Sequence, residues 1–166
     1  MRYRDCPTIE VTERVPCSPE DAWVVVSDIT VPARFSPELQ SVEWLDGATH
    51  PVVGSRFRGT NLNSVLGEWT TECEVDEVDE GRRWVWEVEN GSGAPSATWA
   101  FEVEPTSTGV LVRQWARMGP GPSGLTPAIL RMPDKEARIV AGRIEQWRVA
   151  MTANLSGIRE LLTAGA

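Results

Sequence analysis

Residues able to carry out chemistry are scarce in this sequence, and their spacing matches no catalytic motif. Histidine and tyrosine each occur once, at His50 and Tyr3, whereas tryptophan occurs eight times. General acid–base catalysis needs a group that titrates near the working pH and reaches the substrate. His50 stands beside Pro51 in an expected loop, and Tyr3 lies in the N-terminal arm. Loops do carry functional residues, but we expect His50 to be solvated and idle, and any catalytic residue stays unknown.

The three cysteines, Cys6, Cys17 and Cys73, lack the paired spacing of metal ligands. We therefore expect no metal site and no cofactor. An odd number of cysteines with no signal peptide favours reduced thiols in a cytoplasmic protein, with a Cys6–Cys17 disulfide as the alternative. Cys73 falls within a predicted strand, where a free cysteine is usually a small, buried and inert hydrophobe.

Composition and charge narrow the range of partners. The net charge of −8, from 16 basic and 24 acidic residues, opposes contact with a phosphate backbone, so no nucleic acid partner is expected. No apolar run approaches the roughly 20 residues that span a bilayer, so no stable membrane insertion is expected either. A length of 166 residues suits one domain, residues 1–166, with a sizeable core.

A hydrophobic period of two runs from Gln40 to Met118 and predicts a series of β-strands. The strands are expected at Ile9–Val15, Ser41–Leu45, Ser55–Asn63, Glu68–Val78, Arg83–Glu89, Ala97–Glu104 and Val110–Met118. Short turns such as Asp46-Gly47 and Glu80-Gly81 separate them. Because parallel neighbours would need longer crossovers, the links predict an antiparallel meander.

Helices are expected on both sides of this series. Ser18-Pro19-Glu20-Asp21 has the N-cap, proline and acidic residue of a helix start, and this helix should end near Val31-Pro32. A second helical turn is expected around Ala33–Phe35 and another at Ala128–Arg131. Asp134 can cap a long helix that reaches about Thr163. Its apolar stripe is Ala137, Val140, Ile144, Trp147, Met151, Leu155, Ile158 and Leu162.

These elements predict an α+β fold with an internal cavity. One sheet face must be covered, and the final helix is the element long enough to cover it. A helix is only about 10–12 Å across, too narrow to fill a strongly curved sheet. The expected wall comprises Phe57, Asn61, Trp69, Thr71, Cys73, Trp84, Trp86, Trp99, Phe101, Gln114, Trp147 and Met151. Each aromatic could equally be ordinary core, but the set with its few polar members is typical of a small-molecule site.

Several segments resemble the SRPBCC superfamily, also called START-like or helix-grip, and in particular its polyketide cyclase/dehydrase and lipid-transport family. The resemblance is carried by Ile9-Glu10-Val11, Pro16–Trp23, Gly54–Gly59, Glu68–Thr71, Gly81–Trp86, Trp99–Val103 and Asn154–Arg159. It extends over nearly the full length, and its motifs shape the fold rather than a reaction. It implies a curved antiparallel sheet of about seven strands around a long C-terminal helix, with two short helices after the first strand.

The resemblance implies that a small hydrophobic molecule, such as a lipid, polyketide or aromatic metabolite, is bound or transported. It also implies a lid in the Pro/Gly-rich segment from Gly119 to Pro133, with Leu125, Ile129 and Leu130 as lid residues. One alternative is a polyketide cyclase or aromatase. Against it, Glu72, Glu74, Glu87, Glu102, Arg113 and Arg117 alternate onto the outer sheet face. Another is a non-catalytic interaction subunit or homodimer that uses the outward Trp115, since exposed apolar groups often mark contacts.

Overall fold

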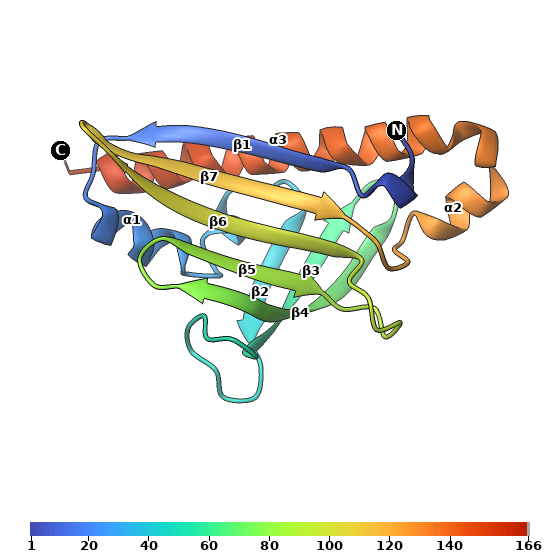
Figure 1. The fold of residues 1–166 in the computed structure, drawn as a ribbon, viewed down its shortest axis with the longest axis horizontal. Helices are drawn as coiled ribbons and strands as arrows, with labels where there is room; N and C mark the ends of the chain where they lie inside the picture. Colours follow the sequence, from blue (N-terminus) through green and yellow to red (C-terminus); the bar gives the residue numbers. More distant parts are fainter. Residues whose placement is uncertain (166) are drawn as a thin grey trace.

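A computed structural model of the chain describes residues 1–165 and shows one curved antiparallel sheet with a long helix along its concave side (Figure 1). The sheet has seven strands in the order β1-β7-β6-β5-β4-β3-β2. The strands are β1 Thr8–Val15, β2 Leu39–Trp44, β3 Arg56–Asn63, β4 Gly67–Asp79, β5 Arg83–Val88, β6 Ala97–Thr106 and β7 Gly109–Met118. The other elements are η1 Tyr3–Asp5, α1 Pro19–Val26, η2 Pro32–Arg34, α2 Thr126–Arg131, η3 Pro133–Lys135 and α3 Glu136–Thr163.

All the predicted strands are present, with ends displaced by at most two residues. Consecutive strands from β2 to β7 pair as a meander, and β1 returns to pair with β7. One irregularity lies in β4, where Val75 pairs with Trp86 but Glu77 pairs with Val85. This bulge inserts one residue and so returns Val78 to the concave face opposite Trp84.

Helix α1 begins as predicted but is shorter than expected. The Ser18 hydroxyl accepts a hydrogen bond from the Asp21 amide at 3.1 Å, and Pro19 occupies the first helical position. The helix ends at Val26 rather than near Val31-Pro32, so that prediction is wrong. Ser27 donates to the Trp23 carbonyl at 2.7 Å, and Asp28 accepts from the Thr30 amide at 2.8 Å. These local side-chain bonds replace the helical pattern at this point.

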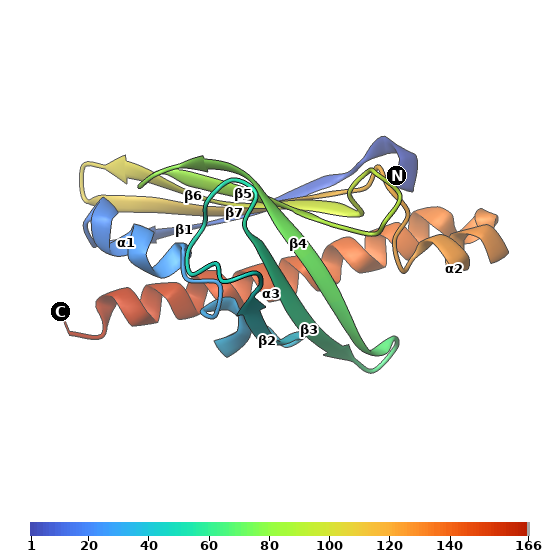
Figure 2. The same cartoon turned by 90° about the horizontal axis from the view of Figure 1, so that it is seen from below.

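Helix α3 buries the predicted stripe from Val140 to Ile158. The helix begins at Glu136, because the residues from Pro133 form a 3-10 turn, and Ala137 is exposed rather than buried. The first turn of α3 projects beyond the sheet beside α2 (Figure 1). Viewed from below, α3 lies along β1, while β3 and β4 cross away from it (Figure 2).

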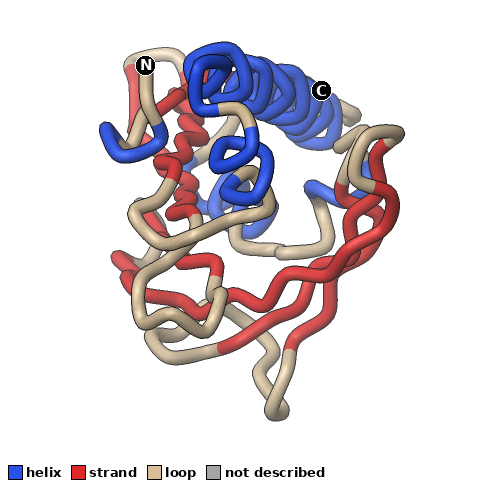
Figure 3. The backbone as a smooth tube through the Cα atoms, turned by 90° about the vertical axis from the view of Figure 1, so that its right-hand side faces the viewer, coloured by secondary structure: helices blue, strands red, loops and turns tan. Residues whose placement is uncertain are grey.

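The sheet curls from one flank of α3 to the other when seen along the helix (Figure 3). Two hydrophobic clusters hold the layers together. One lies beneath α1 and includes Val26, Trp84, Phe101, Leu155 and Ile158. The second lies near the start of α3 and includes Ile9, Ala116, Met118, Val140, Ile144 and Met151. The clusters anchor both ends of the helix on the β1–β7–β6 part of the sheet.

The two glycines of α3 have different surroundings, and this difference allows a matched test. A Cβ atom on Gly157 would collide with the Phe35 ring, whereas a Cβ on Gly142 would meet nothing within 4 Å. We expect Gly157→Ala to destabilise the fold by about 1–3 kcal/mol through overpacking. Gly142→Ala should stabilise it by about 0.5–1 kcal/mol, because alanine is the better helix former. Urea unfolding of both variants checks this, and equal shifts would contradict the close packing at Phe35.

Candidate functional site

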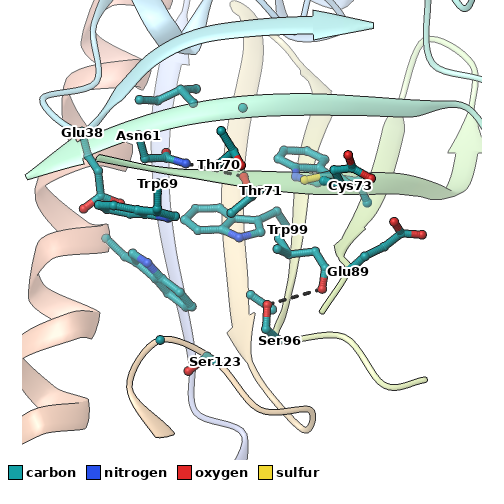
Figure 4. Close-up of a pocket in the computed structure, with 18 of the residues that line it drawn as sticks. Glu38, Asn61, Trp69, Thr70, Thr71, Cys73, Glu89, Ser96, Trp99 and Ser123 are labelled. Carbon is teal, nitrogen blue, oxygen red and sulfur yellow. Dashed lines mark hydrogen bonds between the residues drawn. The ribbon is translucent and has the colours of Figure 1, made fainter. Parts of the chain in front are cut away.

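A cavity of about 1070 Å³ lies between the concave sheet face and α3 (Figure 4). Side chains from β2 to β7 form its wall, α3 forms one side, and loops contribute to its rim. The alternation of each strand explains the lining, because every second side chain points toward the helix. The cavity is large because α3 packs mainly against β1, leaving the β3–β6 surface uncovered.

Aromatic rings form a nearly continuous wall. Trp84 and Trp86 stack with their ring centroids 4.3 Å apart, and Trp86 and Trp99 stack at 6.5 Å with an interplanar angle of 11°. The register makes the second contact possible, since Trp86 and Trp99 are paired across β5 and β6. Trp147 of α3 continues the series at 4.8 Å from Trp99. The wall therefore offers flat, polarisable surfaces on which a planar ring can stack.

The tryptophans differ in how firmly they are held. Trp84 is 2% exposed, and its indole N–H donates to the Val26 carbonyl at 2.9 Å. It therefore belongs to the packed core as much as to the cavity. Trp69, Trp86 and Trp99 are half-buried and keep surface toward the cavity.

Two pairs of polar side chains interrupt the apolar wall. Asn61 donates to the Thr71 hydroxyl at 3.5 Å. Deeper in, Asn154 of α3 donates to Gln114 Oε1 of β7 at 3.3 Å. Gln114 and Asn154 are 3% and 5% exposed, and Asn154 Oδ1 has no hydrogen-bond partner among the described residues. An unpaired buried amide oxygen is costly, which makes this the most unusual polar feature of the wall.

A charged pair closes the cavity between α3 and the edge of the sheet. Both guanidinium nitrogens Nη1 and Nη2 of Arg143 donate to the Glu38 carboxylate at 2.7 Å, and Asn63 donates to the same carboxylate at 3.0 Å. The guanidinium also lies 5.8 Å from the ring centroids of Trp69 and Trp147. Burial raises the pKa of Glu38, but the hydrogen bonds and charge of Arg143 outweigh it, and the net pKa is lowered.

Cys73 contributes a neutral surface to the wall. Burial raises the pKa of its thiol to about 12, so the group stays protonated at neutral pH. The thiolate is the nucleophilic form of cysteine, so this environment makes Cys73 unreactive. Within residues 1–165, no cluster of His, Cys, Asp and Glu side chains is arranged to hold a metal ion.

The sheet has a break beside the cavity, which results from the unequal lengths of β4 and β5. β4 pairs with β5 only from Cys73 onward, so its Trp69–Thr71 segment has no neighbour on that side. Thr70, Glu72 and Glu89 border this break in the sheet, and Ser96 and Ser123 lie across from them (Figure 4). Glu72, predicted on the outer face, therefore stands at the rim, where Arg58 hydrogen-bonds it at 2.7 Å.

The loops around this opening are bonded to each other. Asn90 donates to the Pro122 carbonyl at 3.0 Å, which joins the β5–β6 loop to the segment after β7. The Tyr3 hydroxyl donates to the Gly121 carbonyl at 2.7 Å, so the N-terminal arm fastens the same segment. A Cβ atom at Gly121 would collide with the Ala94 carbonyl, which explains the need for glycine there.

The structure brings most of the predicted wall residues together. Eleven of the twelve line the cavity, namely Phe57, Asn61, Trp69, Thr71, Cys73, Trp84, Trp86, Trp99, Phe101, Gln114 and Trp147. Met151 does not line it; its side chain is 0% exposed and packs in the cluster with Ile9 and Val140. The rotation of α3 about its axis explains this, because it places Met151 on the helix face that meets β1 rather than on the face that lines the cavity.

The three residues predicted for the lid differ in their relation to the cavity, and a lid role stays a prediction. Leu125 lines the cavity, whereas Ile129 and Leu130 do not. Leu125 and Ile129 are four residues apart, so their side chains lie on the same side, and both pack against the hydrophobic cluster near the start of α3. Leu130 follows on the opposite side of α2 and is 76% exposed.

Sequence reasoning missed Glu38, Arg143 and Asn154, which all line the cavity. The spacing of Arg143, Trp147, Ala150 and Asn154 follows one helical flank, and all four residues line the cavity. That flank was recognisable as a helical row, but two of its members are polar and resemble a solvated surface.

Comparison with known proteins places the chain in a family. Residues 7–157 match the family described as polyketide cyclase / dehydrase and lipid transport. The chain belongs to this family. The resemblance inferred from the sequence is thereby confirmed. A search of curated proteins finds no match.

Solved structures support the helix-grip fold. The Polyketide_cyc-like protein Cgl2372 from Corynebacterium glutamicum superposes with a TM-score of 0.65 at 24% identity, covering 93% of this chain and 90% of that one. TTHA0849 from Thermus thermophilus gives 0.65 at 15% identity over 96% and 99% of the two chains. The di-domain ARO/CYC BexL gives 0.71 at 13% identity, and 96% of this chain matches 51% of BexL. At these identities the likeness shows the fold alone, and the predicted helix-grip architecture is confirmed.

The ion pair of Glu38 with Arg143 predicts a pH-dependent contribution to stability. The pKa of Glu38 is lowered in the folded state. The ion pair therefore stabilises the folded protein fully when the pH is above 4.5, the ordinary pKa of glutamate. This stabilisation is lost as the pH falls through the pKa that Glu38 has in the folded state. We expect Glu38→Gln to cost about 1.5–3 kcal/mol at neutral pH, since it removes a buried charged hydrogen bond. This difference from the parent protein should shrink at acidic pH, where Glu38 is itself protonated.

Urea unfolding at neutral and acidic pH measures this difference. Glu145→Gln is the matched control, because Glu145 forms an exposed pair with Arg148 at side-chain exposures of 65% and 52%. Exposed pairs contribute little, so the control should change stability by less than about 1 kcal/mol. A Glu38→Gln deficit that stays constant with pH would refute the assigned role.

Proposed function

We propose that this protein binds a small hydrophobic molecule in the cavity between its sheet and α3. The observation that carries the proposal is the cavity of about 1070 Å³ with its aromatic wall and few polar groups. Ligand sites in proteins typically have volumes of about 300–1,000 Å³ and an apolar lining with a few oriented polar groups. Membership of a family described by both lipid transport and polyketide cyclisation supports the same class of ligand.

Transport or storage is favoured over catalysis by the state of the ionisable groups at the cavity. Glu38 is paired with Arg143, and both Glu72 and Glu89 are paired with Arg56. A general acid or base needs a group free to exchange its proton with the substrate. Carboxylates that are already held in ion pairs are poor candidates for this task.

A second candidate is a polyketide cyclase or aromatase reaction on the bound molecule. The similarity to BexL, a di-domain ARO/CYC of the BE-7585A biosynthetic pathway, favours this alternative at the level of the fold. Holding a flexible chain against flat aromatic walls would itself favour ring closure by proximity. Turnover of a polyketide by the purified protein, lost on substitution of one wall residue, would establish it.

Two tryptophans on opposite sheet faces provide a direct test of the cavity. Trp86 lies in the aromatic wall, while the Trp115 indole donates to Glu102 at 2.9 Å on the outer face and is half-buried, not fully exposed. We expect Trp86→Ala to weaken binding of Nile red, a neutral hydrophobic dye, about tenfold or more, because a large stacking surface is lost. Trp115→Ala should change the affinity less than about twofold.

Nile red fluorescence titration measures both affinities, and circular dichroism establishes that each variant is folded. No saturable dye binding by the parent protein, or an equal loss in both variants, would rule out the cavity as the binding site.

We also propose Leu125 as the lid residue at the rim. Leu125→Ala should weaken Nile red binding about threefold to tenfold and speed its release, because the truncation removes apolar surface from the cavity mouth. Leu130→Ala is the matched control, since Leu130 is 76% exposed on the far side of α2. Stopped-flow dye release distinguishes the two, and identical release rates from both variants would exclude this role.

A further inference from the structure

The deepest polar feature of the cavity is an incompletely bonded pair of amides. Gln114 and Asn154 share one hydrogen bond of 3.3 Å, from Asn154 Nδ2 to Gln114 Oε1. Asn154 Oδ1 has no partner among the described residues, and in the hydrogen bonds of these residues the Gln114 side chain takes part only as an acceptor, through Oε1. An acceptor on Asn154 and a donor group on Gln114 therefore remain available on two side chains that already share a hydrogen bond. A hydroxyl group can satisfy both, since it donates one hydrogen bond and accepts others.

The surroundings of this amide pair are aromatic. Gln114 is paired across β7 and β6 with Phe101, whose ring centroid lies 6.0 Å from that of Trp86. Trp147 precedes Asn154 by two turns of α3 and lies against Trp99. A ring whose hydroxyl reaches these amides would therefore have aromatic side chains as its neighbours.

The cavity provides no free charge to pair with an ionised ligand. Its ionisable lining residues are Glu38, Glu72, Cys73, Glu89 and Arg143. Arg143 is held by Glu38 with a bidentate contact, while Arg56 pairs with both Glu72 and Glu89. Burial of a carboxylate without a counter-charge is strongly unfavourable. An anionic ligand would therefore have to break the Arg143–Glu38 pair.

We propose that the preferred ligand is an uncharged aromatic molecule that carries a hydroxyl group, and that Gln114 and Asn154 bind this hydroxyl. This inference rests on the proposed binding function and adds the chemical class of the ligand and the residues that recognise it. It separates the protein from carriers of free fatty acids, whose ligands present a carboxylate.

Three probes of similar ring size test the inference at neutral pH by displacement of Nile red. They are 2-naphthol, which is neutral and hydroxylated, 2-methylnaphthalene, which is neutral without a hydroxyl, and 2-naphthoate, which is anionic. We expect 2-naphthol to bind about tenfold more tightly than 2-methylnaphthalene, because it restores hydrogen bonds to buried amides. We expect 2-naphthoate to bind at least about tenfold more weakly than 2-methylnaphthalene.

Variants assign the preference to the amide pair. Gln114→Leu and Asn154→Leu should each abolish the preference for 2-naphthol while 2-methylnaphthalene still binds. Thr152→Leu is the control, because this exposed α3 residue undergoes a polar-to-leucine change away from the cavity lining. It should keep the full preference. The comparison of ligands on the parent protein stands even where a variant fails to fold.

The outcomes separate this inference from the proposed function. Equal binding of 2-naphthol and 2-methylnaphthalene would overturn the hydroxyl site and leave hydrophobic binding intact. Preferred binding of 2-naphthoate would overturn the requirement for an uncharged ligand. Persistence of the preference in both leucine variants would overturn the role of Gln114 and Asn154. Failure of Nile red and all three probes to bind would instead overturn the proposed function.

Discussion

The space inside this protein exists because a straight helix meets a strongly curved sheet along one part of that sheet only. Helix α3 packs against β1 and reaches β7, while β3 to β5 curve away from it. Side chains are too short to close the distance at the centre of the curve, so the tryptophans line the space instead of filling it. Alternating apolar side chains on the strands would form a solid core under a flatter sheet. Here the curvature of the sheet turns them into the lining of a hydrophobic cavity.

Different contacts form the two ends of the cavity. At the end beneath α1, Phe35 packs directly on Gly157, and the Trp84 indole donates a hydrogen bond to the Val26 carbonyl, so side chains tie α1 and η2 to the sheet and to α3. At the other end β4 continues past the last residue of β5, which leaves strand backbone unpaired and a gap beside it. The Arg143–Glu38 pair spans from α3 to the β2 side and holds the curved edge near the helix. The two ends therefore depend on separate interactions.

The sequence was sufficient to predict the strands and most of the wall. The alternation of apolar and polar residues assigns each side chain of a strand to one face of the sheet. This assignment holds until a bulge, such as that between Val75 and Glu77, changes the register. Positions on α3 were harder, because an amphipathic helix shows which side is apolar but not how far it is rotated relative to the sheet. That rotation decides that Met151 is core and that Asn154 lines the cavity. The Glu38–Arg143 pair joins residues 105 positions apart, and no local pattern indicates such a contact.

The distribution of charge around the wall is the basis for proposing recognition rather than reaction. Charged side chains near the cavity are neutralised by partners on neighbouring elements, as Glu38 is by Arg143, and Cys73 is kept protonated by burial. Neutral amides are different: they do not titrate near neutral pH, yet they cannot be left unbonded in an apolar interior without cost. In the proposed function, an interior with balanced charges and an unsatisfied amide would distinguish ligands by hydrogen bonding and shape. The Gln114–Asn154 pair is then the point at which a hydrophobic cavity would acquire chemical selectivity.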